Sequence, residues 1–279
     1  MEDGRHPGLR AVRGAVLPLL PGVAHSVALI GVGHPFDTIK TRLQLRLHSS
    51  MSSCAWQTLK EQGVRGFYRG SVMPLTQLVF KRPFEFLVWE WFNSTFRGKT
   101  YAPALGGVVA GILSSVIGCP FSIIKIQLQS NSKVVHAGVY QAAAAVWKSR
   151  GPLGFYRGLV ISMYKEIPFA TVYLGSYGNL REMLPRTAWS PAVAGAAASM
   201  TTWTFLLPLD TLKTVIQARV LQDSKSEPVW TQFRSVVQGR GVFGLWAGLS
   251  PVILRSLPSS AAAMLAYEQA RTFAKEMAD

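Results

Sequence analysis

Three short stretches of the chain share one pattern: Pro35–Lys40 (PFDTIK), Pro120–Lys125 (PFSIIK) and Pro208–Lys213 (PLDTLK). Their prolines are 85 and 88 residues apart, a glutamine follows each lysine by four residues, and a glycine precedes each proline by thirteen. Several independent markers that keep one period indicate homologous units. We therefore predict three repeats, with boundaries at residues 1–98, 99–185 and 186–279.

The segment before each proline is long and uncharged. Residues 15–36, 101–124 and 187–209 contain no Asp, Glu, Lys or Arg and are 22, 24 and 23 residues long. A helix rises ~1.5 Å per residue and the hydrocarbon core of a bilayer is ~30 Å thick, so each segment is long enough to span a membrane.

The second half of each repeat has its own pattern. An aromatic-x-Gly step follows each proline, at Tyr68–Gly70, Tyr156–Gly158 and Trp246–Gly248. We predict that a second spanning helix begins at each step. We also predict a short amphipathic helix on the membrane surface between the two spans, at residues 51–62, 137–150 and 228–240.

The composition fits this reading. Hydrophobic residues make up 49% of the chain and charged residues 15%, against about 25% charged in soluble domains. A net charge of +15 also fits a nucleic-acid-binding protein, but three membrane-length uncharged runs exclude that partner. The three long loops, each from a motif lysine to the next aromatic-x-Gly step, hold sixteen basic and three acidic residues. This excess predicts attraction to anionic lipid such as cardiolipin.

The second helices carry polar groups at bilayer depth. The seventh position after each aromatic-x-Gly glycine is Gln77, Lys165 or Arg255, Glu166 follows Lys165, and Lys81 lies one turn beyond Gln77. An ionisable group at that depth costs ~2.5–3.5 kcal/mol, so it is kept facing a partner or a water-filled cavity. We predict a central solute site, and the alternative is mutual pairing that only holds the helices together.

Two further rings of charge lie toward the ends of the helices. One ring combines the acid or serine and the lysine of each proline motif: Asp37, Lys40, Ser122, Lys125, Asp210 and Lys213. The other lies near the far end of the second helices: Glu90, Asn93, Gly178, Arg181, Glu268 and Arg271. Exposed ion pairs are worth only ~0–1 kcal/mol, so two such rings suit gates that form in turn. The alternative is static charges solvated by lipid head groups.

These motifs together resemble the mitochondrial carrier family, whose pattern is Pro-x-Asp/Glu-x-x-Lys/Arg followed by aromatic-Lys/Arg-Gly. The resemblance covers residues 14–276 and implies an all-α membrane protein in which six transmembrane helices form three pseudo-threefold repeats with short matrix-side amphipathic helices. It also implies a monomer in the mitochondrial inner membrane, with both termini in the intermembrane space.

The resemblance assigns roles to the two rings. It implies matrix-gate pairs Asp37–Lys125 and Asp210–Lys40, braced by Gln44, Gln129 and Gln217, with Lys213 facing Ser122 in place of an acid. At the cytoplasmic gate it implies a Glu90–Arg181 pair, while Gly178 leaves Arg271 without its acid and Asn93 offers Glu268 a neutral hydrogen bond. Cardiolipin is implied near Gly70, Gly158 and Gly248.

Other features resemble the amino-acid and acylcarnitine branch of that family. They are Gly33–Pro35, Lys165 with Glu166, Arg255, and Trp203 five residues before its proline. The resemblance implies exchange of a small zwitterion by alternating access: Glu166 takes the ammonium group, Arg255 and Lys165 take the carboxylate, and Trp203 packs against the solute or only against helices. Carboxylate, nucleotide and S-adenosylmethionine-like solutes stay open.

The sequence does not predict an enzyme. It lacks a clustered acid, base or nucleophile set, the five histidines have no metal-ligand spacing, and the two cysteines, Cys54 and Cys119, are isolated. We therefore expect no catalytic residue, metal or cofactor, apart from bound cardiolipin. The remaining alternative is a membrane receptor or scaffold with the carrier fold that does not transport, which Ser122 and Gly178 favour.

Overall fold

A computed structural model describes residues 20–96, 102–130, 138–185, 190–222 and 227–277, and the regular secondary structure in these ranges is helical throughout. Six helices are long: α2 (Leu20–Gln44), α4 (Val72–Thr95), α5 (Ala102–Ser130), α8 (Leu159–Met183), α9 (Ser190–Ala218) and α11 (Leu249–Glu276). Three shorter α-helices are α3 (Met51–Phe67), α7 (Val139–Arg150) and α10 (Val229–Arg240). The 3₁₀ segments are η2 (Pro152–Tyr156), η3 (Arg219–Leu221) and η4 (Val242–Trp246). The predicted all-α class is confirmed.

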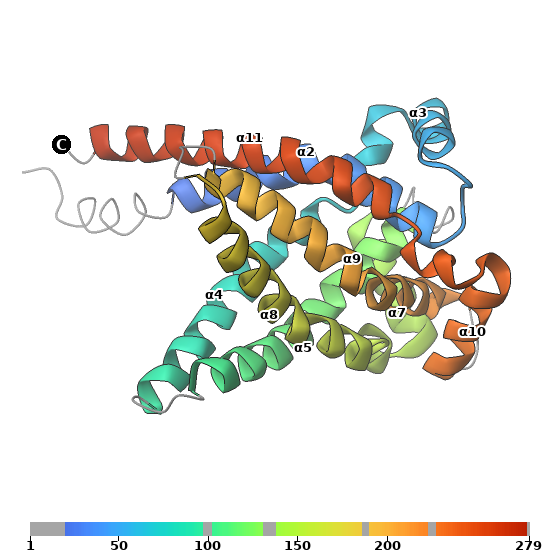
Figure 1. Cartoon of the computed structure of the whole chain (residues 1–279). Coiled ribbons are helices and arrows are strands. Elements are labelled where there is room, and N and C mark those ends of the chain that lie inside the picture. The colour runs from blue at the N-terminus through green and yellow to red at the C-terminus, as the bar shows by residue number, and fades with distance from the viewer. Residues whose placement is uncertain (1–19, 97–101, 131–137, 186–189, 223–226, 278–279) are drawn as a thin grey trace, which may run out of the picture.

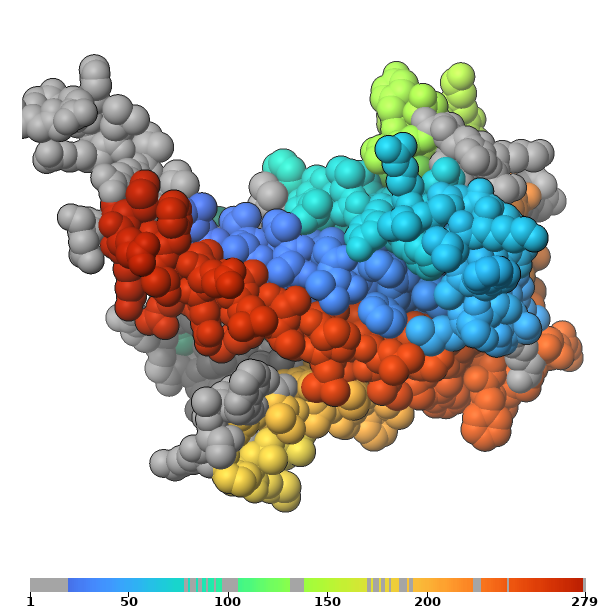
Figure 2. Space-filling view, turned by 90° about the horizontal axis from the view of Figure 1, so that it is seen from above, coloured from blue at the N-terminus to red at the C-terminus, as the bar shows by residue number. Residues whose placement is uncertain are grey.

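The long helices pack in neighbouring pairs: α11 with α2, α4 with α5, and α8 with α9. Figure 1 shows that they spread apart toward the end where the C-terminus lies and converge toward the short helices α3, α7 and α10. Figure 2 shows α11 lying along α2 on the face seen from above. The long helices therefore lie farther apart at the end near the C-terminus, called the open end below, than at the end with the short helices, called the closed end.

Hydropathy alone marks few of these helices as membrane spans. Among the described residues, only Leu105–Ser130 and Val242–Glu276 pass as spans by length and composition. The remaining long helices carry charges within them, such as Asp37 and Lys40 in α2 or Asp210 and Lys213 in α9. Polar groups that face a shared interior lower the mean hydropathy of a helix without preventing it from crossing lipid.

Glycines let two of the second helices begin close to a helix of another repeat. Gly158 and Gly248 are the N-caps of α8 and α11, with φ of 79° and 90°. That left-handed conformation favours glycine. A Cβ on Gly248 would also lie 3.0 Å from Cγ of Lys40. The absence of a side chain on Gly248 therefore allows α11 to begin close to Lys40, the motif lysine of α2.

A threonine ties the closed end together in two repeats. Thr38 donates a hydrogen bond to the carbonyl of Phe67 at 2.7 Å, and Thr211 donates to the carbonyl of Leu245 at 2.8 Å. Both acceptors directly precede an aromatic-x-Gly step. In the middle repeat the equivalent residue is Ile123, which is fully buried and has no hydroxyl to donate.

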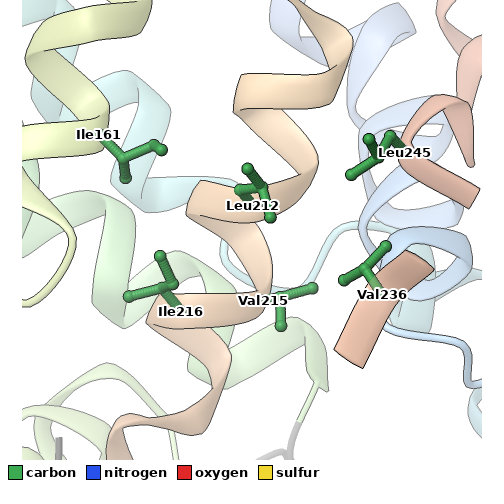
Figure 3. Close-up of a cluster of buried hydrophobic side chains, with 6 residues drawn as sticks. All are labelled: Ile161, Leu212, Val215, Ile216, Val236 and Leu245. Carbon is green, nitrogen blue, oxygen red and sulfur yellow. The ribbon is translucent and has the colours of Figure 1, made fainter. Parts of the chain in front are cut away.

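Apolar packing completes the closed end. Ile161 of α8, Val236 of α10 and Leu245 of η4 form one buried cluster with three residues of α9, Leu212, Val215 and Ile216. Figure 3 shows these six side chains directed toward the space between the helices that carry them. The short helices thus fix the ends of the long ones on this side.

Candidate functional site

A central cavity of about 210 Å³ lies among the long helices, next to the closed end. It is lined by five of the predicted solute-binding residues: Gln77, Lys165, Glu166, Trp203 and Arg255. It is also lined by all six residues of the matrix ring: Asp37, Lys40, Ser122, Lys125, Asp210 and Lys213. The structure therefore brings the predicted solute site and the predicted matrix gate into one chamber.

Asp37 is shared by two cations from other repeats. Its Oδ2 lies 3.2 Å from Nζ of Lys125, which is the expected gate pair. Its Oδ1 lies 2.7 Å from Nη1 of Arg255, which the sequence assigned to the solute instead. The same carboxylate thus holds a gate lysine and a solute-site arginine.

Asp210 repeats this arrangement in a more buried position. Its Oδ2 lies 2.6 Å from Nζ of Lys40 and accepts a hydrogen bond from Nε2 of Gln44 at 3.2 Å, while its Oδ1 lies 3.3 Å from Nζ of Lys165. Side-chain exposure is 10% for Asp210 and 11% for each lysine. Lys165 also lies 3.6 Å from Oε1 of Glu166.

Trp203 contacts protein cations in this structure. The Nζ of Lys40 is 3.9 Å from the ring centroid, and the Nζ of Lys165 is 5.8 Å from it. Phe169 packs edge-on against the same ring, with centroids 5.7 Å apart. The indole face predicted to meet the solute therefore also stabilises the two lysines around Asp210.

The third position of the matrix ring has no carboxylate. Ser122 stands there, and its Oγ accepts a hydrogen bond from Nε2 of Gln77 at 3.4 Å. The same amide donates to the carbonyl of Gly118 at 3.3 Å. Lys213, the predicted counterpart, lines the same cavity.

Only one of the three predicted bracing glutamines touches a gate acid among the described residues. Gln44 donates to Asp210, whereas Gln129 donates to Oγ1 of Thr38 at 3.2 Å. Gln217 donates to the carbonyl of Arg157 and to the sulfur of Cys119, each at 3.5 Å. The glutamines thus join neighbouring repeats, but by different partners.

The second predicted gate lies at the open end. Glu90, Glu268 and Arg271 are exposed near the ends of α4 and α11. The side chains of Asn93, Arg181 and the predicted solute residue Lys81, and the surroundings of Gly178, lie outside what the structure describes.

Sequence reasoning missed several polar residues of this region. Ser115, Ser162 and Thr214 also line the cavity, and their small polar side chains within otherwise apolar helices were the available signal. Arg42 is 4% exposed and donates to Thr58, to Gln62 and to the carbonyl of Gln129. It lies two residues after the motif lysine, and it links α2 to α3 and to the next repeat.

Comparison with known sequences identifies the family. The sequence model of the Mitochondrial carrier protein family matches residues 15–100, 96–188 and 184–278, so the chain belongs to that family. Family membership confirms the three repeats, the membrane fold and the expectation of a transporter of small molecules instead of an enzyme. It also places the chain in the mitochondrial inner membrane.

Individual relatives are moderately similar. The chain is 26% identical to the mitochondrial ornithine transporter 1 of Mus musculus, covering 92% of this chain and 94% of that protein. It is 27% identical to a mitochondrial carnitine/acylcarnitine carrier-like protein of Arabidopsis thaliana, over 91% and 97%. It is 30% identical to the mitochondrial arginine transporter BAC2 of Arabidopsis thaliana, over 88% and 86%.

Proposed function

We propose that this chain exchanges a small charged or zwitterionic metabolite, such as an amino acid or an acylcarnitine-like solute, by alternating access. The proposal rests on one observation: each gate acid contacts both a gate lysine and a cation of the predicted solute site. Asp37 holds both Lys125 and Arg255, and Asp210 holds both Lys40 and Lys165. A solute carboxylate that engages Arg255 or Lys165 competes with Asp37 or Asp210 for that cation.

This competition supplies the differential binding energy that alternating access requires. A ligand shifts a conformational equilibrium only by the difference between its affinities for the two states. Charge-assisted hydrogen bonds contribute about 1.5–3 kcal/mol each, which is enough to displace a pair such as Asp37–Arg255. Glu166, beside Lys165, is the acceptor for a solute ammonium group, and Trp203 lies close enough to Lys165 to contact the same solute.

The relatives support this class of solute. Their names include transporters of ornithine, of arginine and of carnitine or acylcarnitine, and each of these solutes carries both a carboxylate and a cationic nitrogen. Glu166 and Arg255 offer one partner of each sign in the central cavity.

The proposal also includes the orientation of the carrier in the membrane and the lipid that it binds. The closed end, with α3, α7 and α10, faces the matrix, and both termini face the intermembrane space. Cardiolipin head groups bind near Gly70, Gly158 and Gly248, where the backbone N–H groups that begin a helix favour phosphate. The carrier functions as a monomer and needs no cofactor.

Exchange by the purified protein in liposomes tests the proposal. Labelled amino acids and acylcarnitines, with carboxylates and nucleotides as further solute classes, are loaded on one side and exchange is followed with time. Arg255→Ala should lower exchange tenfold to hundredfold, which corresponds to about 1.5–3 kcal/mol of lost solute binding. Arg234→Ala is the matched control, since Arg234 is exposed on α10.

The alternative function is a membrane receptor or scaffold that no longer transports, which Ser122 in place of a gate acid favours. Absence of exchange for every solute class, with a folded protein, would support the scaffold. Exchange that is equally fast in the Arg255→Ala and wild-type proteins would refute the assigned solute site.

A further inference from the structure

A second set of contacts between repeats lies just beyond the motif lysines. The residue two positions after each lysine is Arg42, Gln127 or Val215, and all three are buried. Nε of Arg42 donates a hydrogen bond to the carbonyl of Gln129 at 3.4 Å, and Nε2 of Gln127 donates to the carbonyl of Gln217 at 2.9 Å. Each acceptor is the glutamine that follows the motif lysine of the next repeat. The contact made by Gln127 is called the glutamine link below, and Val215 has no side-chain donor to form its counterpart.

The motif ion pairs join other combinations of repeats. Asp37–Lys125 joins the first repeat to the second, and Asp210–Lys40 joins the third to the first. Between the second and third repeats the motif acid is replaced by Ser122, which has no carboxylate. The glutamine link is formed between these same two repeats.

The glutamine link does not depend on the solute site. Lys165 and Asp210 also join the second and third repeats, with 3.3 Å between Nζ and Oδ1. Lys165 belongs to the predicted solute site, so a solute carboxylate that engages it competes with that pair. Gln127 is 0% exposed and is not among the described residues that line the central cavity. A bound solute therefore leaves the glutamine link in place.

The second repeat holds the whole C-terminal end of α9. The amide of the glutamine link also donates to the carbonyl of Ala218 at 3.0 Å. Nη1 of Arg157 donates to the carbonyl of Arg219 at 3.2 Å, and Nε of Arg150 donates to the carbonyl of Val220 at 3.3 Å. The last carbonyls of a helix have no partner within it. Side chains of the second repeat supply donors to four consecutive carbonyls at this end.

We propose that Gln127 is a gate residue, which holds the closed end together between the second and third repeats where the motif acid is Ser122. The end of α9 stays attached to the middle repeat while this side is closed, and the glutamine link is released when the side opens. The role in gating rests on the proposed transport function. The link itself can be tested without transport.

A native thiol reports whether this interface loosens. Cys119 of α5 is 1% exposed, and its sulfur accepts a hydrogen bond from Nε2 of Gln217 of α9 at 3.5 Å. Cys54 is 0% exposed and lies within the first repeat, in one cluster with Ile39 and Leu43. Labelling of a buried thiol requires a local opening of the structure. A comparison of the two cysteines therefore separates loosening of this interface from general unfolding.

N-ethylmaleimide is added to the purified carrier in detergent, and mass spectrometry gives the labelling rate at each cysteine. Gln127→Met keeps a long unbranched side chain but removes both donated hydrogen bonds. It should raise the rate at Cys119 about tenfold, the effect expected from the loss of two neutral hydrogen bonds, and leave Cys54 unchanged. Gln127→Arg should stay near the wild type, because Arg42 donates from the equivalent position.

Gln238→Met is the matched control, since Gln238 is exposed on α10, and it should leave both rates unchanged. An unchanged rate at Cys119 in Gln127→Met would overturn the inference, and so would an equal rise at both cysteines. If Gln127→Met does not fold, Gln127→Asn gives the same comparison, because its amide is one methylene shorter and is withdrawn from the carbonyls of α9.

Transport in liposomes tests the gating role. Without counter-solute, Gln127→Met should lose preloaded labelled ornithine or carnitine faster than the wild type, because its matrix side closes less tightly. The KM for exchange should stay unchanged, because the solute site is intact. An unchanged loss or a raised KM would overturn the gating role. Absence of exchange by the wild type for every solute class would refute the proposed transport function instead, and the labelling of Cys119 would then decide the glutamine link by itself.

Discussion

Replacing Asp210 by asparagine should destabilise the closed end more than the same change at Asp37. Asp210 and its two lysines are 10–11% exposed, whereas the side chains of Asp37, Lys125 and Arg255 are 21–27% exposed. Removing one partner of a buried ion pair costs about 3–5 kcal/mol, because the remaining charges stay desolvated. For the more hydrated Asp37 we expect about 1–3 kcal/mol.

The measurement is the denaturant midpoint of the purified protein at fixed detergent and lipid concentrations. Asp210→Asn and Asp37→Asn are compared with the wild type, and the double variant Asp210→Asn/Lys40→Gln tests the pair directly. Because the second substitution removes a cation that has already lost its acid, the double variant should lose less stability than the sum of the single losses.

Two results would refute this reasoning. One is a larger loss for Asp37→Asn than for Asp210→Asn, which would mean that burial does not set the strength of these pairs. The other is strict additivity of Asp210→Asn and Lys40→Gln, which would mean that the 2.6 Å contact between the two side chains contributes no coupling.

Three further predictions follow from other contacts. Gly248→Ala should destabilise the carrier by about 1–2 kcal/mol, the cost of a left-handed non-glycine residue, and a loss below that of an alanine substitution at exposed Gln269 in the same helix would contradict it. Arg42→Met should lower the unfolding temperature, since it removes charged hydrogen bonds worth about 1.5–3 kcal/mol, whereas Arg42→Lys, which keeps the charge, should lower it less. An equal loss in the two variants would contradict a role for the charge of Arg42. Cys54 should resist alkylation by iodoacetamide at pH 8 until the protein unfolds, because its side chain is 0% exposed and burial raises the pKa of its thiol, which lowers the thiolate fraction. Rapid labelling of the folded protein would contradict this prediction.

The arrangement of helices was largely predictable because it depends on patterns within the chain. The proline motifs predicted long helices that contain Pro35, Pro120 and Pro208, and α2, α5 and α9 run through these residues. The expected surface segments correspond to α3, α7 and α10. Equal spacing after the aromatic-x-Gly steps also predicted that Gln77, Lys165 and Arg255 share a cavity.

The pairing inside the cavity was not predictable from spacing. Depth along a helix follows from the residue number, but the direction of a long flexible side chain depends on the neighbouring helices. Arg255 contacts Asp37 and Lys165 contacts Asp210 in this structure, although the sequence predicted that both cations bind the solute carboxylate. Gln129 and Gln217 likewise form hydrogen bonds that depend on Thr38 and on Cys119, two residues outside the repeated lysine-to-glutamine pattern.

Thr38 and Thr211 form a hydrogen bond that Ile123 cannot form, so the three repeats are held together differently at the closed end. In the first and third repeats, a hydroxyl–carbonyl hydrogen bond and an ion pair both hold the closed end. In the middle repeat, position 123 presents only hydrocarbon, and position 122 supplies no charge. We therefore expect the conformational change to start in the middle repeat and then spread to its two neighbours, so that the pseudo-threefold symmetry of the fold is not a symmetry of its motion.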